Sequence, residues 1–159
     1  MSKLEVELRP ITGERIEAEL KKLGIRFAVN AADSSILLPY PNFTAFIARI
    51  DDDRNGKCLV FLGQWGRRLN VAYIALAKNI VQSAASSTYA PRMAFKVTDD
   101  GYIVFSTSWR FQWDSQNVTD LQLREELRMA IAATAQAMDR LEHEFADPWM
   151  NPPEEPKVD

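Results

Sequence analysis

Hydrophobic positions near the start of the chain repeat with the period of a helix. Ile16, Leu20 and Leu23 recur at intervals of four and three residues, so they share one helical face. Thr12 is a favourable N-cap residue, and Gly24 can adopt the left-handed conformation that often follows a helix. We therefore expect the first helix to begin after Thr12 and to end before Gly24.

Alternation of apolar and polar residues then predicts strands. We expect two short strands at 25–29 and 36–38, a longer strand at 43–50 and its antiparallel return at 57–65. Asn55-Gly56 lies between the last two segments, and this pair of residues favours the positive φ angles of a tight hairpin turn.

The second half of the chain predicts a helix, a hairpin and a long helix. The helix at 70–86 is rich in alanine, so it is a candidate element for close packing or dimer formation; its apolar face holds Val71, Ile74, Ala77 and Val81. Strands at 93–98 and 102–111 flank Asp99-Asp100-Gly101, another turn sequence. The last helix, at 119–145, carries one apolar stripe, formed by Leu123, Leu127, Ile131, Met138, Leu141 and Phe145.

Together these elements predict one α+β domain over residues 11–146. The predicted order is helix, three antiparallel strands, helix, two antiparallel strands and a long C-terminal helix. A chain of 159 residues is long enough to bury a core of its own. We expect residues 1–10 to be an N-terminal extension and residues 147–159, which are acidic and rich in proline, to be a disordered tail.

The net charge is concentrated at the end of the chain. The sequence has 19 Lys and Arg against 22 Asp and Glu, a net charge of −3. Residues 147–159 hold four carboxylates and one lysine, which is also −3, so residues 1–146 are neutral. A neutral body gives no electrostatic reason to expect nucleic acid or an anionic membrane as a partner.

Few residues in this sequence can carry metal or nucleophilic chemistry. His143 and Cys58 are the only residues of their types, too few for a zinc site or a Ser/His/Asp triad within one chain. We therefore expect no metal, no cofactor and no catalytic residue, and a protein that is not an enzyme.

The start of the chain does not resemble a secretory signal. Lys3, Glu5 and Glu7 fall where a signal peptide needs an apolar run. The apolar stretches are also far shorter than the ~20 residues that span a bilayer. A cytoplasmic location is expected.

One acidic loop resembles half of a calcium site. Asp51, Asp53 and Asn55 have the spacing of the first EF-hand ligands, and Gly56 takes the place of the EF-hand glycine. The position that should carry a bidentate Glu is Leu62, and the flanking segments predict strands rather than helices. We expect a solvated hairpin turn without a metal.

The segment 63–68 connects a predicted strand to a predicted helix. Backbone N–H groups and the helix dipole can hold an anion at such a place, so Gly66, Arg67 and Arg68 are candidate anion-binding residues. The segment lacks the Lys-Ser/Thr ending of a P-loop and the three glycines of a dinucleotide site. We expect an ordinary connection with solvated arginines in preference to an anion site.

Aromatic residues gather near residue 110. Trp109, Phe111 and Trp113 alternate with Arg110 and Gln112, which places the three rings on one face of an extended segment. Rings of this size dominate both protein cores and partner interfaces. Stacking on single-stranded bases would also require a basic groove, which a neutral body does not predict.

The element order resembles that of the YbjN family of bacterial proteins. The resemblance depends on the helix that ends in Leu23-Gly24 and continues as Ile-Arg-Phe-Ala-Val, on the strand pair around Asn55-Gly56 and on the helix after Arg68. It covers residues 11–146. The aromatic segment at 109–113 and the acidic tail are not recognisable parts of it.

This resemblance implies a function in binding rather than catalysis. The family is labelled a sensory transduction regulator, and its fold looks like that of type III secretion chaperones, dimers that hold extended polypeptides. We therefore expect a homodimer that binds a polypeptide partner, with Trp65, Trp109, Phe111 and Trp113 as candidate anchors. The competing interpretation is a small-molecule or phosphate-binding protein, or an enzyme, that uses the Gly63–Arg68 connection.

Overall fold

The computed structural model describes residues 6–52, 56–86, 90–111 and 117–146. Its elements follow in the order β1 (Arg9–Pro10), α1 (Gly13–Lys22), β2 (Ala28–Val29), β3 (Ile36–Pro39), β4 (Phe43–Asp52), β5 (Gly56–Trp65), β6 (Leu69–Asn70), the 3₁₀ turn η2 (Val71–Tyr73), α2 (Ile74–Ala85), β7 (Arg92–Val97), β8 (Tyr102–Arg110), β9 (Asn117–Val118) and α3 (Asp120–Glu144). The predicted tail at 147–159 and the loop residues 53–55 lie outside the described residues.

Most strands belong to one antiparallel sheet. Its order is β2-β3-β4-β5-β8, and β8 has β7 along its other side. The short β6 pairs with the start of β8 on the side that β5 occupies further along. A separate two-stranded sheet joins β1 to β9.

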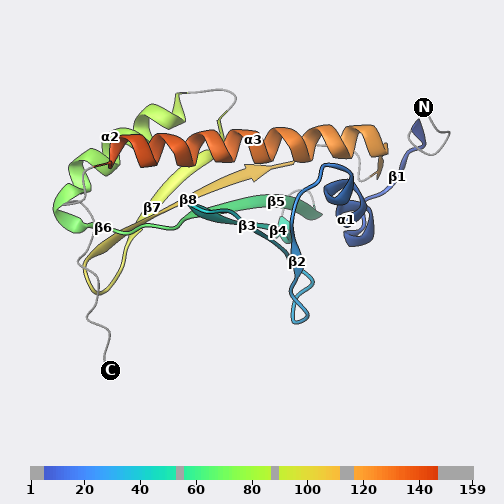
Figure 1. Ribbon diagram of the computed structural model, residues 1–159, viewed down its shortest axis with the longest axis horizontal. Helices are drawn as coiled ribbons and strands as arrows, with labels where there is room; N and C mark the ends of the chain where they lie inside the picture. The colour runs from blue at the N-terminus through green and yellow to red at the C-terminus, as the bar shows by residue number, and fades with distance from the viewer. Residues whose placement is uncertain (1–5, 53–55, 87–89, 112–116, 147–159) are drawn as a thin grey trace.

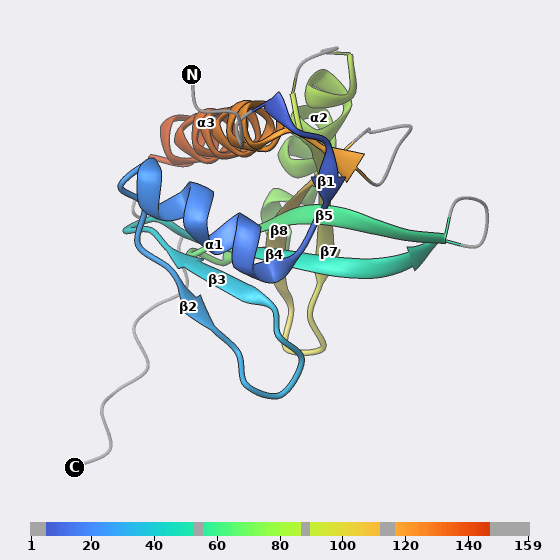
Figure 2. The same cartoon turned by 90° about the vertical axis from the view of Figure 1, so that its right-hand side faces the viewer.

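The three helices cover one face of the large sheet. Figures 1 and 2 show α2 and α3 lying along this face, and α1 packs beside α3. The strands contribute to the buried core beneath the helices with Ile36, Leu38, Phe43, Ala45, Ile47, Leu59, Phe61, Trp65, Met93, Ile103 and Phe105. In the described part of the chain, no helix lies against the opposite face (Figures 1 and 2).

The first helix has the ends that the sequence predicts. The Thr12 hydroxyl accepts a hydrogen bond from the Arg15 backbone N–H, and Gly24 has a φ of 71°. The N–H groups of Gly24 and Ile25 donate to the carbonyls of Lys21 and Leu20, which is the Schellman pattern of hydrogen bonds. These contacts occupy backbone groups that a helix end would otherwise leave without partners.

The last helix begins with a capping box. The Thr119 hydroxyl accepts from the Gln122 backbone N–H, and the Gln122 side chain accepts from the Thr119 N–H. The predicted stripe is confirmed for Leu123, Leu127, Met138, Leu141 and Phe145, all of which are buried. Ile131 is only partly buried, and the stripe is completed by Ala130 and Thr134.

The α+β class is confirmed, with differences in the strands. The sequence predicts four strand segments between the first two helices, although the predicted order has three strands there. In the structure all four pair in sequence, and β6 follows them. The strand predicted at 25–29 shrinks to Ala28–Val29. Arg9 and Pro10, expected within an extension, pair with Val118 and Asn117.

Candidate functional site

The aromatic residues expected to anchor a partner lie mostly in the core. Trp65 is 1% exposed and packs against Phe105 and Phe145. Phe111 is also buried, and Trp109 is partly buried with its indole N–H donating to Glu126. Neither Trp65 nor Phe111 presents its ring to a partner in this structure, so we do not retain them as anchors.

Trp113 lies outside the described residues. Of the four candidates, Trp109 alone combines a described position with a ring that is not fully buried. It stands opposite Phe61 in the β5–β8 pair, on the face that the helices cover. The core interpretation therefore holds for the described rings near residue 110.

Arg67 binds the C-terminal end of α3. Its guanidinium donates to Glu142 at 3.0 Å and to the Phe145 carbonyl at 2.7 Å, and it lies over the Trp65 ring at 5.0 Å from the centroid. The Trp65 indole N–H donates to the same Glu142 carboxylate at 2.8 Å. These contacts fasten the C-terminal end of α3 to the end of β5.

The other two candidate anion ligands are also engaged. The Gly66 N–H donates to the Asn42 carbonyl at 2.9 Å. Arg68 lies over the Tyr102 ring at 4.6 Å and 3.5 Å from Asp100. In addition, β6 and η2 separate this segment from the first turn of α2. The connection does not have the geometry of a helix N-terminal anion site. That alternative required the strand to lead directly into the helix.

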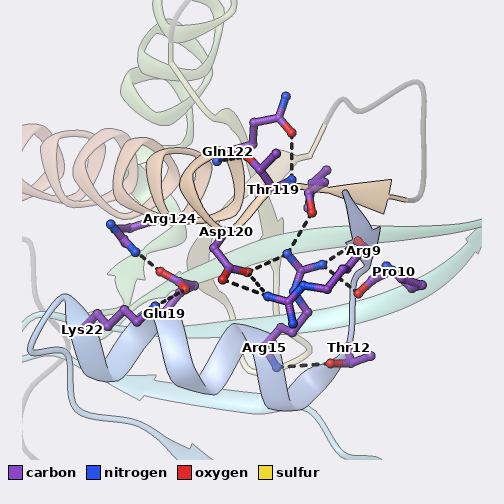
Figure 3. A network of polar contacts seen from close by, with 11 residues as sticks. Arg9, Pro10, Thr12, Arg15, Glu19, Lys22, Thr119, Asp120, Gln122 and Arg124 are labelled. Atoms are coloured by element: carbon purple, nitrogen blue, oxygen red, sulfur yellow. Dashed lines mark hydrogen bonds and ion pairs between the residues drawn. The ribbon is translucent and has the colours of Figure 1, made fainter. Parts of the chain in front are cut away.

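A dense polar network joins β1, α1 and the start of α3 (Figure 3). Arg9 binds both oxygens of the Asp120 carboxylate, at 2.8 and 2.9 Å, and Arg15 binds one of them at 2.8 Å. Arg15 also donates to the carbonyls of Pro10 and Val118. Two cations therefore bind one carboxylate, and Arg15 also binds the backbone of β1 and β9.

The network has the character of a structural clamp. Burial by itself raises the pKa of Asp120, but the hydrogen bond from Arg15 and the charges of Arg9, Arg15 and Lys22 together lower it. Next to it, the buried Glu19 binds Arg124 at 2.7 Å and Lys22 at 3.0 Å. Held ionised by these cations, Asp120 is a poor proton donor. The contacts of Asp120 with Arg15 and of Glu19 with Arg124 fix the position of α1 against α3.

The face of the sheet that no described helix covers is the more informative surface. Strand pairing places its residues in rows, since residues opposite one another in an antiparallel pair point to the same side. One row runs Leu37, Phe46, Leu62, Ser108 and Arg92 across β3, β4, β5, β8 and β7. The next row runs Pro39, Thr44, Gln64, Ser106 and Ala94.

Further rows extend this surface in both directions along the strands. Ala48, Val60 and Arg110 form a row on one side, and Val104 stands opposite Lys96 on the other. We call the surface formed by these four rows the open face. Val60 and Val104 are buried among their neighbours, whereas Leu62 is 37% exposed and Phe46 is partly exposed.

A groove of about 380 Å³ crosses the middle of the open face. Its walls come from β4, β5, β7 and β8, with Phe46, Leu62, Gly63, Gln64, Arg92, Ala94, Ser106, Thr107 and Ser108. Apolar side chains from β4 and β5 lie on one side of this groove, and hydroxyl groups from β8 lie on the other. The groove therefore offers both apolar surface and hydrogen-bonding groups.

The charge of the open face has one sign. At the paired positions whose side chains the structure describes, the charged residues are Arg92, Lys96 and Arg110, and all three are exposed. They lie on β7 and β8, next to the apolar side chains of β4 and β5. The neutral charge of residues 1–146 as a whole conceals this local cationic edge.

Sequence reasoning did not identify the open face, although a signal was present. In β4 and β5 both alternating sets of residues are apolar, for example Ile47 with Phe46 and Phe61 with Leu62. Such strands are covered on both faces or expose an apolar surface. Only the placement of all three helices on one side decides between these possibilities.

Comparisons with known proteins bear on the fold. No protein-family model and no curated protein matches the sequence. Among solved structures, the chain is similar to YbjN from E. coli, a candidate transcription regulator, with a TM-score of 0.62 over 87% of this chain and 97% of that one. The chain has a YbjN-like fold. The sequence identity to YbjN is 20%, so the similarity establishes the fold alone.

The described residues hold neither a candidate metal cluster nor a candidate membrane-spanning helix. Within the described ranges, His, Cys, Asp and Glu side chains form no group of three that could hold a metal ion. None of the described helices combines the length and the apolar character needed to cross a bilayer.

Proposed function

We propose that this chain is a non-enzymatic regulatory domain that binds a polypeptide partner on its open face. The observation that carries the proposal is an apolar groove on the face that the helices leave uncovered, with exposed Arg92 in its lining and exposed Lys96 and Arg110 in the neighbouring rows. The YbjN-like fold supports a regulatory role because YbjN itself is a candidate regulator. A cytoplasmic location is part of the proposal.

The chemistry of the open face defines the partner segment. An extended segment can follow the groove and place apolar side chains against Phe46 and Leu62. Acidic residues on the same segment would then meet Arg92, Lys96 or Arg110. We therefore expect an extended sequence that combines aromatic or aliphatic residues with carboxylates.

Short synthetic peptides that vary in charge and apolar content test this proposal. The full chain should retain peptides that are both acidic and aromatic, and raising NaCl from about 0.05 to 0.5 M should weaken their binding, because salt screens exposed charges. Fluorescence polarisation of labelled peptides measures the dissociation constants. Equal retention of basic and acidic peptides would count against the proposal.

Matched variants locate the binding surface. Leu62→Gln and Arg92→Glu, on the open face, should each weaken peptide binding by about tenfold, equivalent to about 1.4 kcal/mol. Met129→Gln on α3 and Lys78→Glu on α2 are the matched controls, at exposed positions on the helices. The Met129 side chain is 43% exposed, against 37% for Leu62. Equal effects from both pairs would reject the open face as the binding site.

The homodimer implied by the resemblance stays part of the proposal. A mass of twice the 18.1 kDa chain by light scattering at micromolar concentration would support it. A monomer mass under those conditions would remove the dimer from the proposal and leave the binding face unaffected.

A further inference from the structure

We propose that residues 147–159 of this chain bind to the open face of the same molecule and compete there with a partner. The competition rests on the proposed function, whereas the docking itself requires no partner. The inference combines the charge of the open face, the composition of this segment and the place from which the segment starts.

The charges of the two surfaces are opposite. Residues 147–159 have a net charge of −3, from Asp147, Glu154, Glu155 and Asp159 against Lys157. The described charged side chains of the open face are all cationic. Since residues 1–146 are neutral, the segment has no reason to be attracted to the body in general, and the open face supplies a specific cationic target.

The segment also matches the groove in its apolar content. Trp149 and Met150 provide large, adaptable apolar side chains, and four prolines disfavour both helix and regular sheet pairing. A proline-rich sequence loses less conformational entropy when an extended site holds it. The segment therefore has the combination of apolar and acidic residues that the proposed partner needs.

The starting point of the segment lies at the correct end of the sheet. Phe145, the C-cap of α3, packs against Trp65 on β5 and Phe105 on β8. The next residues along these strands, Gln64 and Ser106, point to the open face and line the groove. Figure 1 shows this end of α3 above the end of the sheet that carries β6.

The length of the segment is sufficient to reach the groove. Layers in a domain lie about 10 Å apart. An extended proline-rich chain spans about 3.1 Å per residue, so the thirteen residues from 147 to 159 can span about 40 Å. A path around the strand ends meets the row of Val104 and Lys96 first, then the Gln64 row, and then the row that contains Leu62 and Arg92.

A spin label placed in the segment tests the docking in the full chain. The variant Asn151→Cys combined with Cys58→Ser carries one nitroxide, and an unchanged thermal unfolding midpoint shows that the fold is intact. Amide NMR signals of Leu62, Gln64 and Ala94 should broaden, and those around Met129 on the outer side of α3 should not. The broadening should fall in about 1 M NaCl, where the screening length is about 3 Å.

Two controls identify the source of the broadening. Glu154→Lys with Glu155→Lys in the labelled chain should abolish it, whereas Lys78→Glu on α2 should leave it unchanged. In a mixture of nitroxide-carrying chain at natural isotope abundance with nitroxide-free ¹⁵N chain, the open-face signals of the ¹⁵N chain should not broaden. Transfer to the ¹⁵N chain would show docking between copies and overturn the proposal, as would broadening without preference for the open face.

Competition is measured separately with the acidic, aromatic peptide used as the probe. In the full chain with Glu154→Lys and Glu155→Lys, this peptide should bind about five- to tenfold more tightly, because the tethered competitor is removed. An unchanged dissociation constant would overturn the competition. If neither chain binds the peptide while selective broadening persists, the proposed function fails and the docking stands.

Discussion

At the scale of single residues, Asp120 is a carboxylate that binds two arginines from different elements. It is the first residue of α3, where a carboxylate is favoured by the helix dipole, and it holds Arg9 from β1 and Arg15 from α1. The Arg15 side chain and the Asp120 side chain are each 11% exposed. Removing the charge of one partner would therefore leave the other poorly solvated.

We predict that Asp120→Asn destabilises the fold by about 2 kcal/mol at neutral pH, because the largely buried Arg15 guanidinium loses its anionic acceptor. The pKa of Asp120 is lower in the folded chain than in the unfolded one, so this carboxylate stabilises the fold fully above the unfolded value. That stabilisation is lost as the pH falls through the folded pKa. The difference between wild type and variant should therefore shrink as the pH falls below the unfolded pKa and through the folded one.

Urea unfolding at a series of pH values measures this difference. Glu125→Gln is the matched control, because Glu125 also binds an arginine, Arg128 at 2.8 Å, and also has a lowered pKa, but it is exposed. Little change is expected for this control at any pH. A pH-independent effect of Asp120→Asn would show that the loss arises from packing rather than from the charge.

A second prediction at this scale concerns a buried hydroxyl. Thr134 is 0% exposed in the middle of α3, and its Oγ1 has no hydrogen-bond partner in the structure. Replacing it with Val keeps the shape and removes an unsatisfied polar atom, so Thr134→Val should stabilise the fold by about 1 kcal/mol. The same change at the N-cap, Thr119→Val, should cost about 1 kcal/mol, because the Gln122 N–H loses the hydroxyl that accepts its hydrogen bond. Equal signs for the two variants in urea unfolding would contradict this explanation.

At the scale of elements, the sequence predicts best those features that local contacts decide. The ends of α1 and the start of α3 depend on residues within one or two turns, such as Thr12 and Gly24, and both are confirmed. The turn at Asp99-Asp100-Gly101 is similar: Gly101 has a φ of 84°, and its N–H donates to the Thr98 carbonyl. In each case the residues that specify the feature are neighbours in the sequence.

Features that distant segments decide could not be predicted in the same way. The helix predicted at 70–86 begins only at Ile74, because Leu69 and Asn70 pair with Ile103 and Tyr102 of β8. Val71, expected on the buried helical face, is instead 38% exposed in η2. The strands β1 and β9 are two residues each and form only because α1 and α3 bring Arg9 and Val118 together.

The close packing of α3 against β5 predicts the effect of adding a methyl group at Gly63. A Cβ atom on Gly63 would lie 2.6 Å from the Thr107 Oγ1, 2.9 Å from the Thr134 Cγ2 and 3.0 Å from the Met138 Cε. Gly63→Ala should therefore cost about 1–3 kcal/mol, since the helix or the strand must shift. A cost near zero in urea unfolding would show that α3 can move away from β5 freely.

A second glycine provides the control for this prediction. Gly13, in the first turn of α1, has nothing within 4 Å of the position of an added Cβ. Gly13→Ala should therefore be neutral or stabilise the fold by up to about 1 kcal/mol, by restricting the unfolded chain. A comparable loss at both positions would indicate a backbone effect rather than the close approach at Gly63.

At the scale of the whole molecule, the candidate site is a consequence of how the layers are distributed. The composition predicts a neutral body without catalytic residues, and the sequence cannot show that this neutrality is uneven. Arg92, Lys96 and Arg110 come from two strands, and they share one edge of the open face only once β7 and β8 have paired. The apolar rows form in the same way, by the joining of β3, β4 and β5. The periodicity of a single strand does not show which face of the sheet the helices cover.

Neighbouring residues on β5 test this two-sided architecture directly. Phe61 faces the helices and is 0% exposed, whereas the next residue, Leu62, faces the groove and is 37% exposed. Phe61→Ala should cost about 3–5 kcal/mol, because it empties a packed site, and Leu62→Gln should change the free energy of unfolding by no more than about 0.5 kcal/mol. Urea unfolding of the two variants gives both values. If Leu62→Gln were as damaging as Phe61→Ala, the open face would have to be covered in the folded protein, and its apolar rows would then serve stability rather than binding. A small effect on stability together with weakened peptide binding would assign those rows to recognition.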